Sequence, residues 1–363
     1  MGGDQTKADQ NGAKERFTLL EARFFELSPL GFWPTLLAVF LFAFGSALAI
    51  AHFTQQPPIL DEIGTSGVYR LEPVLWVCFV LSLILTAALG LAESGRRMWV
   101  RETRQLAAAL KPEGEAAAKA LVDGAPANWR GRYTGFLIGG VLAGFGVNIA
   151  IMLAMGAPVG AYFSSIGLWF FLFSSPLYAL GLRAGVDLAR ESGELRSVIR
   201  DHLHVDLLNL ERLQVFGRIG LRGALSWMIM AAIMLLFVLD PSAEAGSEIN
   251  AIATLIALPL AGVGGTVIFI SAVSPVRKAV QSAKTAEIEA IRVRISEERG
   301  RILDPQAETR GKLAELLAYQ DWVEKRPEWP ISAPVTTRFA LYVLIPAIPW
   351  FGAALADRII SSV

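Results

Sequence analysis

Seven apolar runs, each close to the length that crosses a bilayer, constrain this chain more than any other feature. They cover residues 30–51, 74–92, 134–155, 166–182, 223–239, 251–273 and 339–355. A transmembrane helix needs about 20 predominantly apolar residues. The mean hydropathy of +0.47 is higher than that of an ordinary soluble domain. The sequence therefore predicts an all-α, polytopic membrane protein with about seven transmembrane helices.

The basic residues are distributed unevenly over the connecting segments. Residues 93–132 contain eight Lys and Arg and residues 183–222 contain seven, whereas residues 52–73 contain only Arg70 and residues 240–250 none. Because basic loops stay on the cytoplasmic side, this alternation predicts a cytoplasmic N-terminus. The last run is only about 17 residues long and contains Pro346 and Pro349. Seven spans place the C-terminus outside, and a re-entrant or interfacial last segment leaves six spans.

The predicted organisation has four parts. Residues 1–29 form a cytoplasmic tail, of which 1–14 are disordered and the rest form an amphipathic interfacial helix. Residues 30–273 form a six-span region whose loops 93–132 and 183–222 are helical and cytoplasmic. Residues 274–336 form a cytoplasmic helical hairpin. Residues 337–363 carry the C-terminal transmembrane or re-entrant helix.

The tail has one apolar helical face, made by Phe17, Leu20, Phe24 and Leu27. Two interpretations remain open for this face. It lies in the interface of the cytoplasmic leaflet, or it packs on cytoplasmic helices of the same protein.

The hairpin is predicted from two helix-start signals and two apolar stripes. Ser274-Pro275 and Asp304-Pro305 each combine an N-cap residue with proline at the first helical position. The stripes have the spacing of a coiled-coil seam: Ile288, Ile291, Ile295 and Ile302 in the first helix, and Leu313, Leu316, Gln320 and Val323 in the second. The first stripe is the candidate interaction face.

Small residues recur within the spans, together with one strongly polar side chain. Such rows let helices approach closely in lipid, and they also suit a flexible pore helix. The helix-packing or pore candidates are Gly135, Gly139, Gly140, Gly144, Asn148 and Gly265. Asn148 is interpreted as an interhelical hydrogen-bond partner rather than a substrate ligand.

A basic cluster follows the second span. It consists of Arg96, Arg97, Arg101 and Arg104. These arginines are lipid-contact candidates, because juxtamembrane basic clusters attract anionic lipid. The alternative is an ordinary charge excess that only sets the topology.

Chemical motifs are weak in this sequence. His202, His204 and Asp206 are spaced for a strand or loop, and on a helix their side chains fall on different faces, so no metal site is predicted. Ionisable residues do not occur well inside any predicted span, which disfavours a coupled transporter. Neither catalytic residues nor a cofactor site is predicted, and the formal net charge of zero gives no reason to expect nucleic acid.

Two stretches carry a resemblance. One comprises residues 206–210 and 215–222, and the other comprises 316–319, 328–330 and 338–350. Together with the basic helix after the sixth span, they resemble a group of uncharacterised bacterial multi-span membrane proteins. The resemblance covers roughly the C-terminal half and implies a bacterial cytoplasmic (inner) membrane location. It implies no activity.

These observations favour a non-enzymatic integral membrane protein. The expected function is that of an oligomeric interaction, signalling or scaffold protein, and the alternative is a channel or passive conduit. The expected partners are the lipid bilayer, further copies of the chain and a cytoplasmic protein.

Overall fold

The computed structural model describes residues 16–17, 20–54, 59–62, 69–122, 125–126, 130–154, 156, 158–237, 248–303, 312–329, 331–348 and 352. The predicted disorder of residues 1–14 and the helix start at Asp304-Pro305 lie outside them. The helices are α2 (Leu20–Leu27), α3 (Phe32–Thr54), α4 (Pro73–Ala107), α5 (Glu115–Val122), α6 (Arg130–Ala154), α7 (Val159–Phe163), α8 (Gly167–His202), α9 (Gln214–Leu235), α10 (Glu248–Leu303), α11 (Lys312–Glu324) and α12 (Ala333–Val343).

Short elements complete the described structure. The 3-10 turns are η1 (Pro112–Gly114), η3 (Leu210–Leu213) and η4 (Ile345–Ala347). Strand β1 (Arg16–Phe17) pairs antiparallel with β4 (Ala125–Pro126), and β2 (Leu60–Glu62) pairs antiparallel with β3 (Tyr69–Leu71). Phe17 therefore belongs to a strand, and the predicted N-terminal helix begins only at Leu20.

Five described helices are long and apolar enough to cross a membrane. They contain the predicted spans one, two, three, five and six, within α3, α4, α6, α9 and α10. The fourth predicted span lies in α8, which packs along α6 and also contacts α3 and α4. The apolar part of α8 is short, because Arg183 lies only 16 residues after the first residue of the helix.

The outer faces of these helices are apolar and exposed. On α10, Ile256, Leu260, Val263, Val267 and Ile270 repeat every three or four residues and are 44–64% exposed. A continuous apolar stripe of this kind would be a liability in water and is the ordinary surface of a helix in lipid. The stripe ends at Ile270.

Tryptophan indoles join neighbouring helices within the apolar region. Trp169 on α8 donates to the carbonyl of Ala43 on α3, and Trp227 on α9 donates to the carbonyl of Ala261 on α10, each at 2.9 Å. Buried indole N–H groups need such acceptors, and a helix carbonyl can accept a second hydrogen bond.

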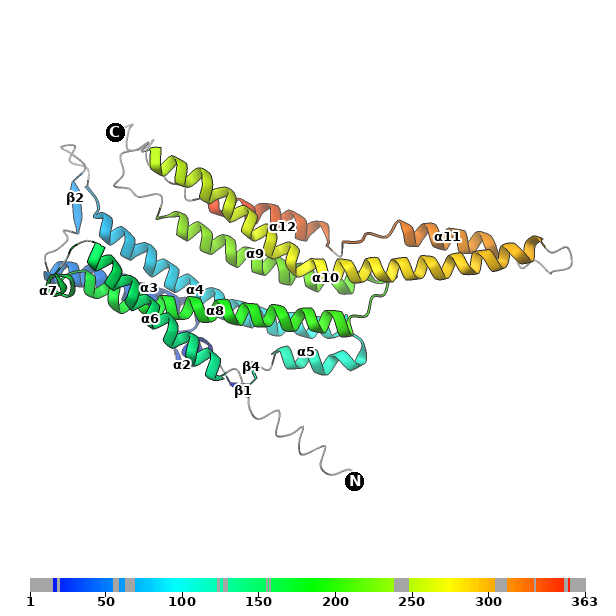
Figure 1. Cartoon of the computed structure of the whole chain (residues 1–363), viewed down its shortest axis with the longest axis horizontal. Coiled ribbons are helices and arrows are strands. Elements are labelled where there is room, and N and C mark those ends of the chain that lie inside the picture. Colours follow the sequence, from blue (N-terminus) through cyan, green and yellow to red (C-terminus); the bar gives the residue numbers. More distant parts are fainter. Residues whose placement is uncertain are drawn as a thin grey trace, which may run out of the picture.

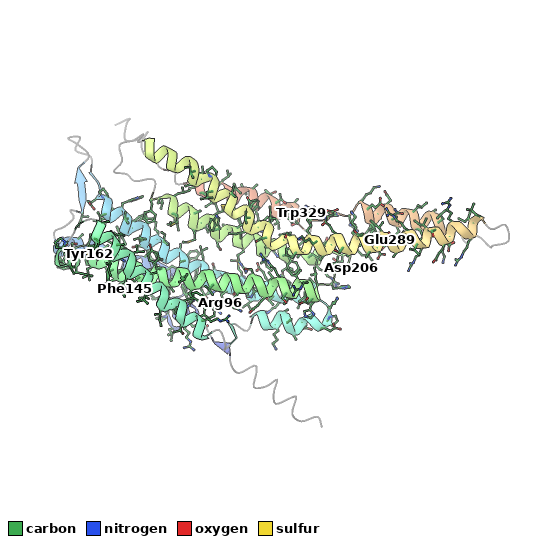
Figure 2. All side chains as sticks on the ribbon, viewed as in Figure 1. Arg96, Phe145, Tyr162, Asp206, Glu289 and Trp329 are labelled. Atoms are coloured by element: carbon green, nitrogen blue, oxygen red, sulfur yellow. The ribbon has the colours of Figure 1, made fainter. Side chains whose placement is uncertain are left out.

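The helices α4, α8 and α10 continue far beyond their apolar segments, as the sequence predicts for spans two, four and six. Their extensions, with α5 and the first turns of α9, form what we call the helical layer (Figure 1). Its core contains the fully buried side chains of Leu106, Leu213, Phe216, Val276 and Val280. Figure 2 places Tyr162 and Phe145 toward one end of the molecule and Asp206 and Glu289 toward the other, with Arg96 between them.

Helix α10 runs without a break from the apolar region to the far end of the molecule (Figure 1). The prediction that Ser274-Pro275 begins a new helix is wrong, because Pro275 lies inside α10. Proline in a helix interior costs about 3 kcal/mol. The flanking Val273 and Val276 are completely buried, in two different cores, and this packing holds the helix through the proline.

The distal part of α10 and helix α11 lie side by side and form what we call the arm, residues 281–303 and 312–324 (Figure 1). Ile291 and Val323 are buried between them. The Tyr319 hydroxyl and a Glu287 carboxylate oxygen lie 3.1 Å apart. Lys284 Nζ donates to the carbonyls of Glu324 and Arg326, which satisfies the C-terminus of α11.

The last predicted span, 339–355, is described only as far as residue 348 and at residue 352, and its remaining residues lie outside the described part of the chain. Helix α12 begins at Ala333 and ends at Val343, and Pro346 lies in η4. Eleven helical residues extend only about 16 Å, which is shorter than the hydrocarbon core. Helix α12 packs on α9 and α10, where Phe339 stacks on Phe269 at 4.6 Å between ring centroids.

Helix α2 packs on α4 by only part of its surface. Phe25 is buried and lies 5.5 Å from the ring of Phe32, whereas Phe24 is 44% and Leu27 83% exposed. The exposed pair favours the interfacial interpretation of this helix over complete packing on the protein.

Glu328 anchors the base of the arm, and its protonation should weaken that anchor. Gln281 Nε2 lies 2.6 Å from its carboxylate and Arg277 3.5 Å. The hydrogen bond from Gln281, assisted by Arg277, lowers the pKa of Glu328 below its usual value of 4.5. Because the folded-state pKa is the lower one, the stabilisation is present above about pH 4.5 and is lost as the pH falls through the folded value.

We therefore expect the thermal midpoint of the wild type to exceed that of Glu328→Gln at pH 7. The difference should shrink toward zero as the pH is lowered from 5 to 3. Glu315→Gln, on the exposed side of α11, serves as the control and should show no such pH-dependent difference. A constant difference for Glu328→Gln across this range would contradict the assignment.

Candidate functional site: a groove along the arm

Two of the predicted packing glycines lie where α6 meets α8. A Cβ atom on Gly144 would lie 2.6 Å from Ser175 Cα, and one on Gly140 would lie 2.8 Å from the backbone nitrogen of Ala179. Real Cβ atoms do not approach backbone so closely, so only glycine permits this helix separation. Gly265 on α10 faces the end of the Met228 side chain on α9, which is flexible and can move aside, so this contact depends less strictly on glycine.

Asn148 joins α6, α7 and α8 through its side-chain amide. Its Nδ2 donates to the Gly144 carbonyl at 2.8 Å and to Ser174 Oγ at 2.6 Å, and its Oδ1 accepts from the Tyr162 hydroxyl at 3.1 Å. Asn148 is 3% exposed. These bonds link three helices, as expected of an interhelical hydrogen-bond partner.

Gly135 and Gly139 lie on the other side of α6. A Cβ atom on either would meet no described atom within 4 Å. The six candidate residues therefore do not share one surface, and the described chain does not bring Gly139, Gly144 and Asn148 together along one axis.

The juxtamembrane arginines divide into two pairs. Arg96 and Arg97 both bind Glu93, whose carboxylate is 1% exposed, with Nε to oxygen distances of 2.8 and 2.6 Å. These two cations neutralise a buried anion, which would be costly to bury alone. Arg101 and Arg104 are exposed and have no ion-pair partner among the described residues, so they are the members left for contact with lipid headgroups.

The histidine run marks the end of α8. His202 is the last residue of that helix, its carbonyl accepts from the Lys111 backbone N–H at 2.8 Å, and the His204 N–H donates to the Ala109 carbonyl. The run thus fastens the end of α8 to the end of α4. Among the described residues, no group of three His, Cys, Asp or Glu side chains is arranged to hold a metal ion.

The predicted interaction face is divided between the inside and the outside of the arm. Ile291 is 3% exposed, and Ile288 and Ile295 are partly buried against the same core. These three residues therefore pack within the chain. Ile302 is 42% exposed and lies outside this core, so its assignment to the seam is wrong. The apolar spacing of the sequence continues for two turns beyond Ile295, the last residue of the packed seam on α10.

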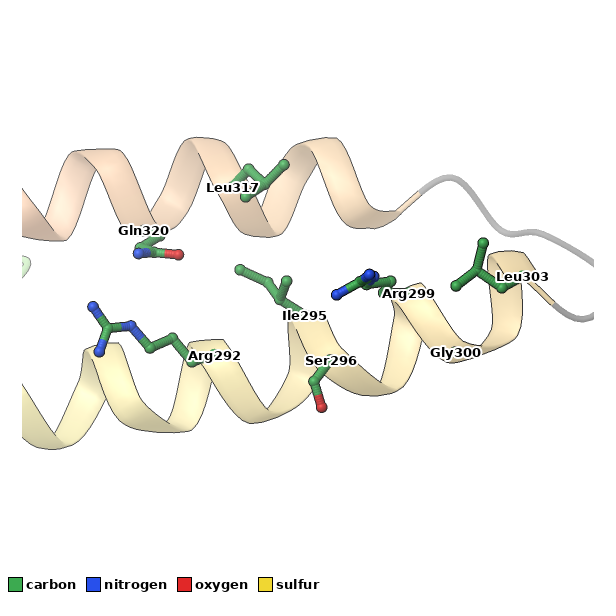
Figure 3. Close-up of a pocket in the computed structure, with 8 residues that line it drawn as sticks. All are labelled: Arg292, Ile295, Ser296, Arg299, Gly300, Leu303, Leu317 and Gln320. Carbon is green, nitrogen blue, oxygen red and sulfur yellow. The ribbon is translucent and has the colours of Figure 1, made fainter.

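An open groove runs along the distal half of the arm (Figure 3). It has a volume of about 420 Å³, and its lining comprises Arg292, Ile295, Ser296, Arg299, Gly300, Leu303, Leu317 and Gln320. Leu303 is 69% exposed and Leu317 49%. Exposed leucines on both helices make this groove an apolar surface of the arm that the described residues leave uncovered.

The groove is also positively charged. Arg292 and Arg299 lie on either side of Ile295 along α10 (Figure 3), the lining contains no carboxylate, and neither arginine forms an ion pair with a described residue. A second groove has a different character, because it contains Glu297, Glu298 and Glu315 beside Arg294 and Lys312. Only the first groove combines exposed leucines with an uncompensated positive charge.

Comparisons with protein-family models, with curated proteins and with solved structures find no match for this chain. The resemblance noted from the sequence therefore stays a prediction.

Sequence reasoning missed the groove and the partners of Asn148. Leu303, Leu317 and Arg299 depart from the apolar seam, and their proximity depends on how α11 folds back on α10. Tyr162 and Ser174 are separated from Asn148 by 14 and 26 residues. The Ser174-Ser175-Pro176 run was the available sequence signal for a polar site on α8. Nothing in the sequence indicates that α7 brings Tyr162 to Asn148.

Substituting the two sides of α6 should have unequal effects. We expect Gly144→Ala to lower the stability of the purified protein by about 1–3 kcal/mol, because its methyl group overpacks against α8. Gly139→Ala faces open space and should leave the thermal midpoint in detergent unchanged or slightly raised, since alanine favours a helix over glycine. Equal losses for the two variants would contradict this assignment of the α6 faces.

Proposed function

We propose that this protein is a non-enzymatic, multi-pass membrane protein whose arm makes protein–protein contacts on the cytoplasmic side. The observation that carries this proposal is the continuity of α10. One 56-residue helix extends from the lipid-facing stripe through the helical layer to the end of the arm. An apolar, charged groove at the end of so long a support suits contact with another molecule.

The base of the arm is firmly held, which suits an interaction device that must keep its orientation. Arg277 lies over the ring of Trp329 at 4.6 Å and bonds to Glu328, while Lys284 binds the end of α11. A scaffold or signalling protein requires such a rigid connection, because a movement in the bundle reaches the arm only through stiff elements.

The bundle favours this function over a conduit. At Gly140 and Gly144, α6 and α8 approach so closely that no space for a polar pathway is left between them. The side-chain amide of Asn148 forms its hydrogen bonds with protein groups. The exposed face of α6 with Gly135 and Gly139 suits a contact between copies of the chain in lipid.

The proposed topology follows the charge pattern. The basic loops and the arm lie in the cytoplasm of a bacterium, beneath its inner membrane, and α8 is the fourth crossing, added to the five long apolar helices. The segment 339–355 forms the seventh crossing, in which the second half of α12 and η4 are the first part and the residues after 348 the remainder. The N-terminal tail and α2 lie at the cytoplasmic leaflet, beside the exposed Arg101 and Arg104.

Cysteine labelling tests the proposed sides of the membrane. In a Cys78→Ser background, we expect Ile59→Cys to react with a membrane-impermeant maleimide in cells whose outer membrane is permeabilised. Ser296→Cys, on the arm, should react only after the inner membrane is broken. Labelling of Ser296→Cys in intact cells would contradict the cytoplasmic arm.

Photo-crosslinking in cells tests the arm as the interacting part. A photoreactive residue at Leu303 should give a discrete product larger than the protein. The matched control is Leu208, which is 68% exposed against 69% for Leu303 and lies in the turn between α8 and η3, away from the arm, and it should give none. No product from Leu303, or the same products from both positions, would contradict the proposal.

A further inference from the structure

We infer that the groove on the arm is a docking site for an amphipathic helix that carries an apolar stripe flanked by carboxylates about seven residues apart. This inference rests on the proposed function and specifies the chemistry of the partner. Its basis is the combination, within one surface, of groove shape, exposed leucines and two arginines that form no ion pair with a described residue.

The dimensions of the groove suit a helix. From Arg292 to Leu303 the groove follows α10 for 11 residues, which corresponds to about 16 Å or three helical turns. Ile295 and Leu303 border it on α10, and Leu317 borders it on α11 (Figure 3). A partner helix lying between α10 and α11 would cover these side chains by the ordinary packing of one helix in the groove of two others.

The charges specify which kind of helix. Arg292 and Arg299 are seven residues apart, two turns of α10, so they lie on the same side of that helix about 10 Å apart along its axis. Carboxylates at i and i+7 on a partner helix match that spacing. Arginine binds carboxylate with two parallel hydrogen bonds, which gives geometric specificity as well as attraction.

A second copy of the arm fits this groove poorly. A twofold contact would place the lining against itself, and the lining has two arginines and no acid. Such a contact brings four like charges into one interface, which opposes association. The occupant indicated by charge complementarity is therefore a different, acidic helix.

The test uses the full-length protein in nanodiscs and two synthetic helical peptides. The acidic peptide has leucines along one face with glutamates seven residues apart on the margin, and the basic peptide has lysines in place of those glutamates. Fluorescence anisotropy gives the affinity of each. We expect the acidic peptide to bind the wild type and the basic peptide to bind far more weakly.

Charge reversal should exchange this preference. Exposed ion pairs each change affinity by a factor of up to about five, and the double variant Arg292→Glu with Arg299→Glu replaces two attractions by two repulsions. It should bind the acidic peptide at least about tenfold more weakly, and should bind the basic peptide better than the wild type does. Leu317→Gln should lower the affinity for the acidic peptide by about fivefold or more.

The matched control reverses two charges on the other groove, Arg294→Glu with Lys312→Glu. It has the same net charge change, but its side chains line the other groove, so it should weaken binding of the acidic peptide by no more than about twofold at physiological salt, where charges that do not contact the peptide are partly screened. The groove variants should keep the thermal midpoint of the wild type, because their side chains are exposed or line the open groove. The control adds glutamates beside Glu297, Glu298 and Glu315, so its thermal midpoint should fall slightly, and its affinity is measured below that midpoint. Equal weakening by the two double variants would overturn the inference.

Two further outcomes would also overturn it. One is no binding of the acidic peptide to the wild type. The other is a concentration-dependent dimer through the arm that competes with the peptide. If the Leu303 crosslink persists in either case, the arm remains an interaction site and only the acidic-helix assignment fails. If the crosslink is also absent, the proposed function fails with it.

Discussion

Helix continuity through Pro275 is the constraint on which the remaining structure depends. A proline in a helix interior lacks a hydrogen-bond donor and crowds the preceding turn, at a cost of about 3 kcal/mol. Val273 and Val276 on either side of it are completely buried, one against α9 and α12 and the other inside the helical layer. Burying aliphatic side chains of this size contributes about 1.5–3 kcal/mol each, so the two contacts together offset the proline. Without this packing the arm would be a separate hairpin on a hinge.

The apolar region depends on a different device. Without water to drive helices together, close packing and interhelical hydrogen bonds supply the attraction. Gly140 and Gly144 let α6 reach the backbone of α8, and this approach brings Asn148 within 2.6 Å of Ser174. Gly265 likewise lets α10 lie close to the Met228 side chain of α9. The tryptophan indoles donate hydrogen bonds to backbone carbonyls of adjacent helices. The exposed stripe of α10, by contrast, consists of Ile, Leu and Val, as suits a helix face in contact with lipid.

The sequence predicted what depends on local pattern and missed what depends on tertiary contact. Apolar runs identified the helices of the membrane region, and the spacing of Ile288, Ile291 and Ile295 predicted the seam with Val323. Ser274-Pro275 is a valid helix-start signal locally, but burial on both sides overrides it. Glu93 directly follows the second apolar run and had no predicted role, yet it is buried, with Arg96 and Arg97 neutralising it from consecutive positions. The groove was missed because Leu303, Leu317 and Arg299 become neighbours only once α11 folds back on α10.

The base of the arm and its distal half have different surfaces, one suited to packing within the chain and the other to binding. Residues near its base satisfy one another: Lys284 binds the end of α11, and Glu328 accepts from Gln281. In the distal half of the arm, apolar side chains such as Leu303 and Leu317 are exposed instead of packed between α10 and α11. The groove there contains Arg292 and Arg299 but no carboxylate. A helix pair selected only for its own stability would end its apolar stripe where its seam ends, or place acids beside those arginines. Exposed leucines beside two arginines that form no ion pair with a described residue add little to the stability of the arm, and the proposed contact with another molecule would account for both.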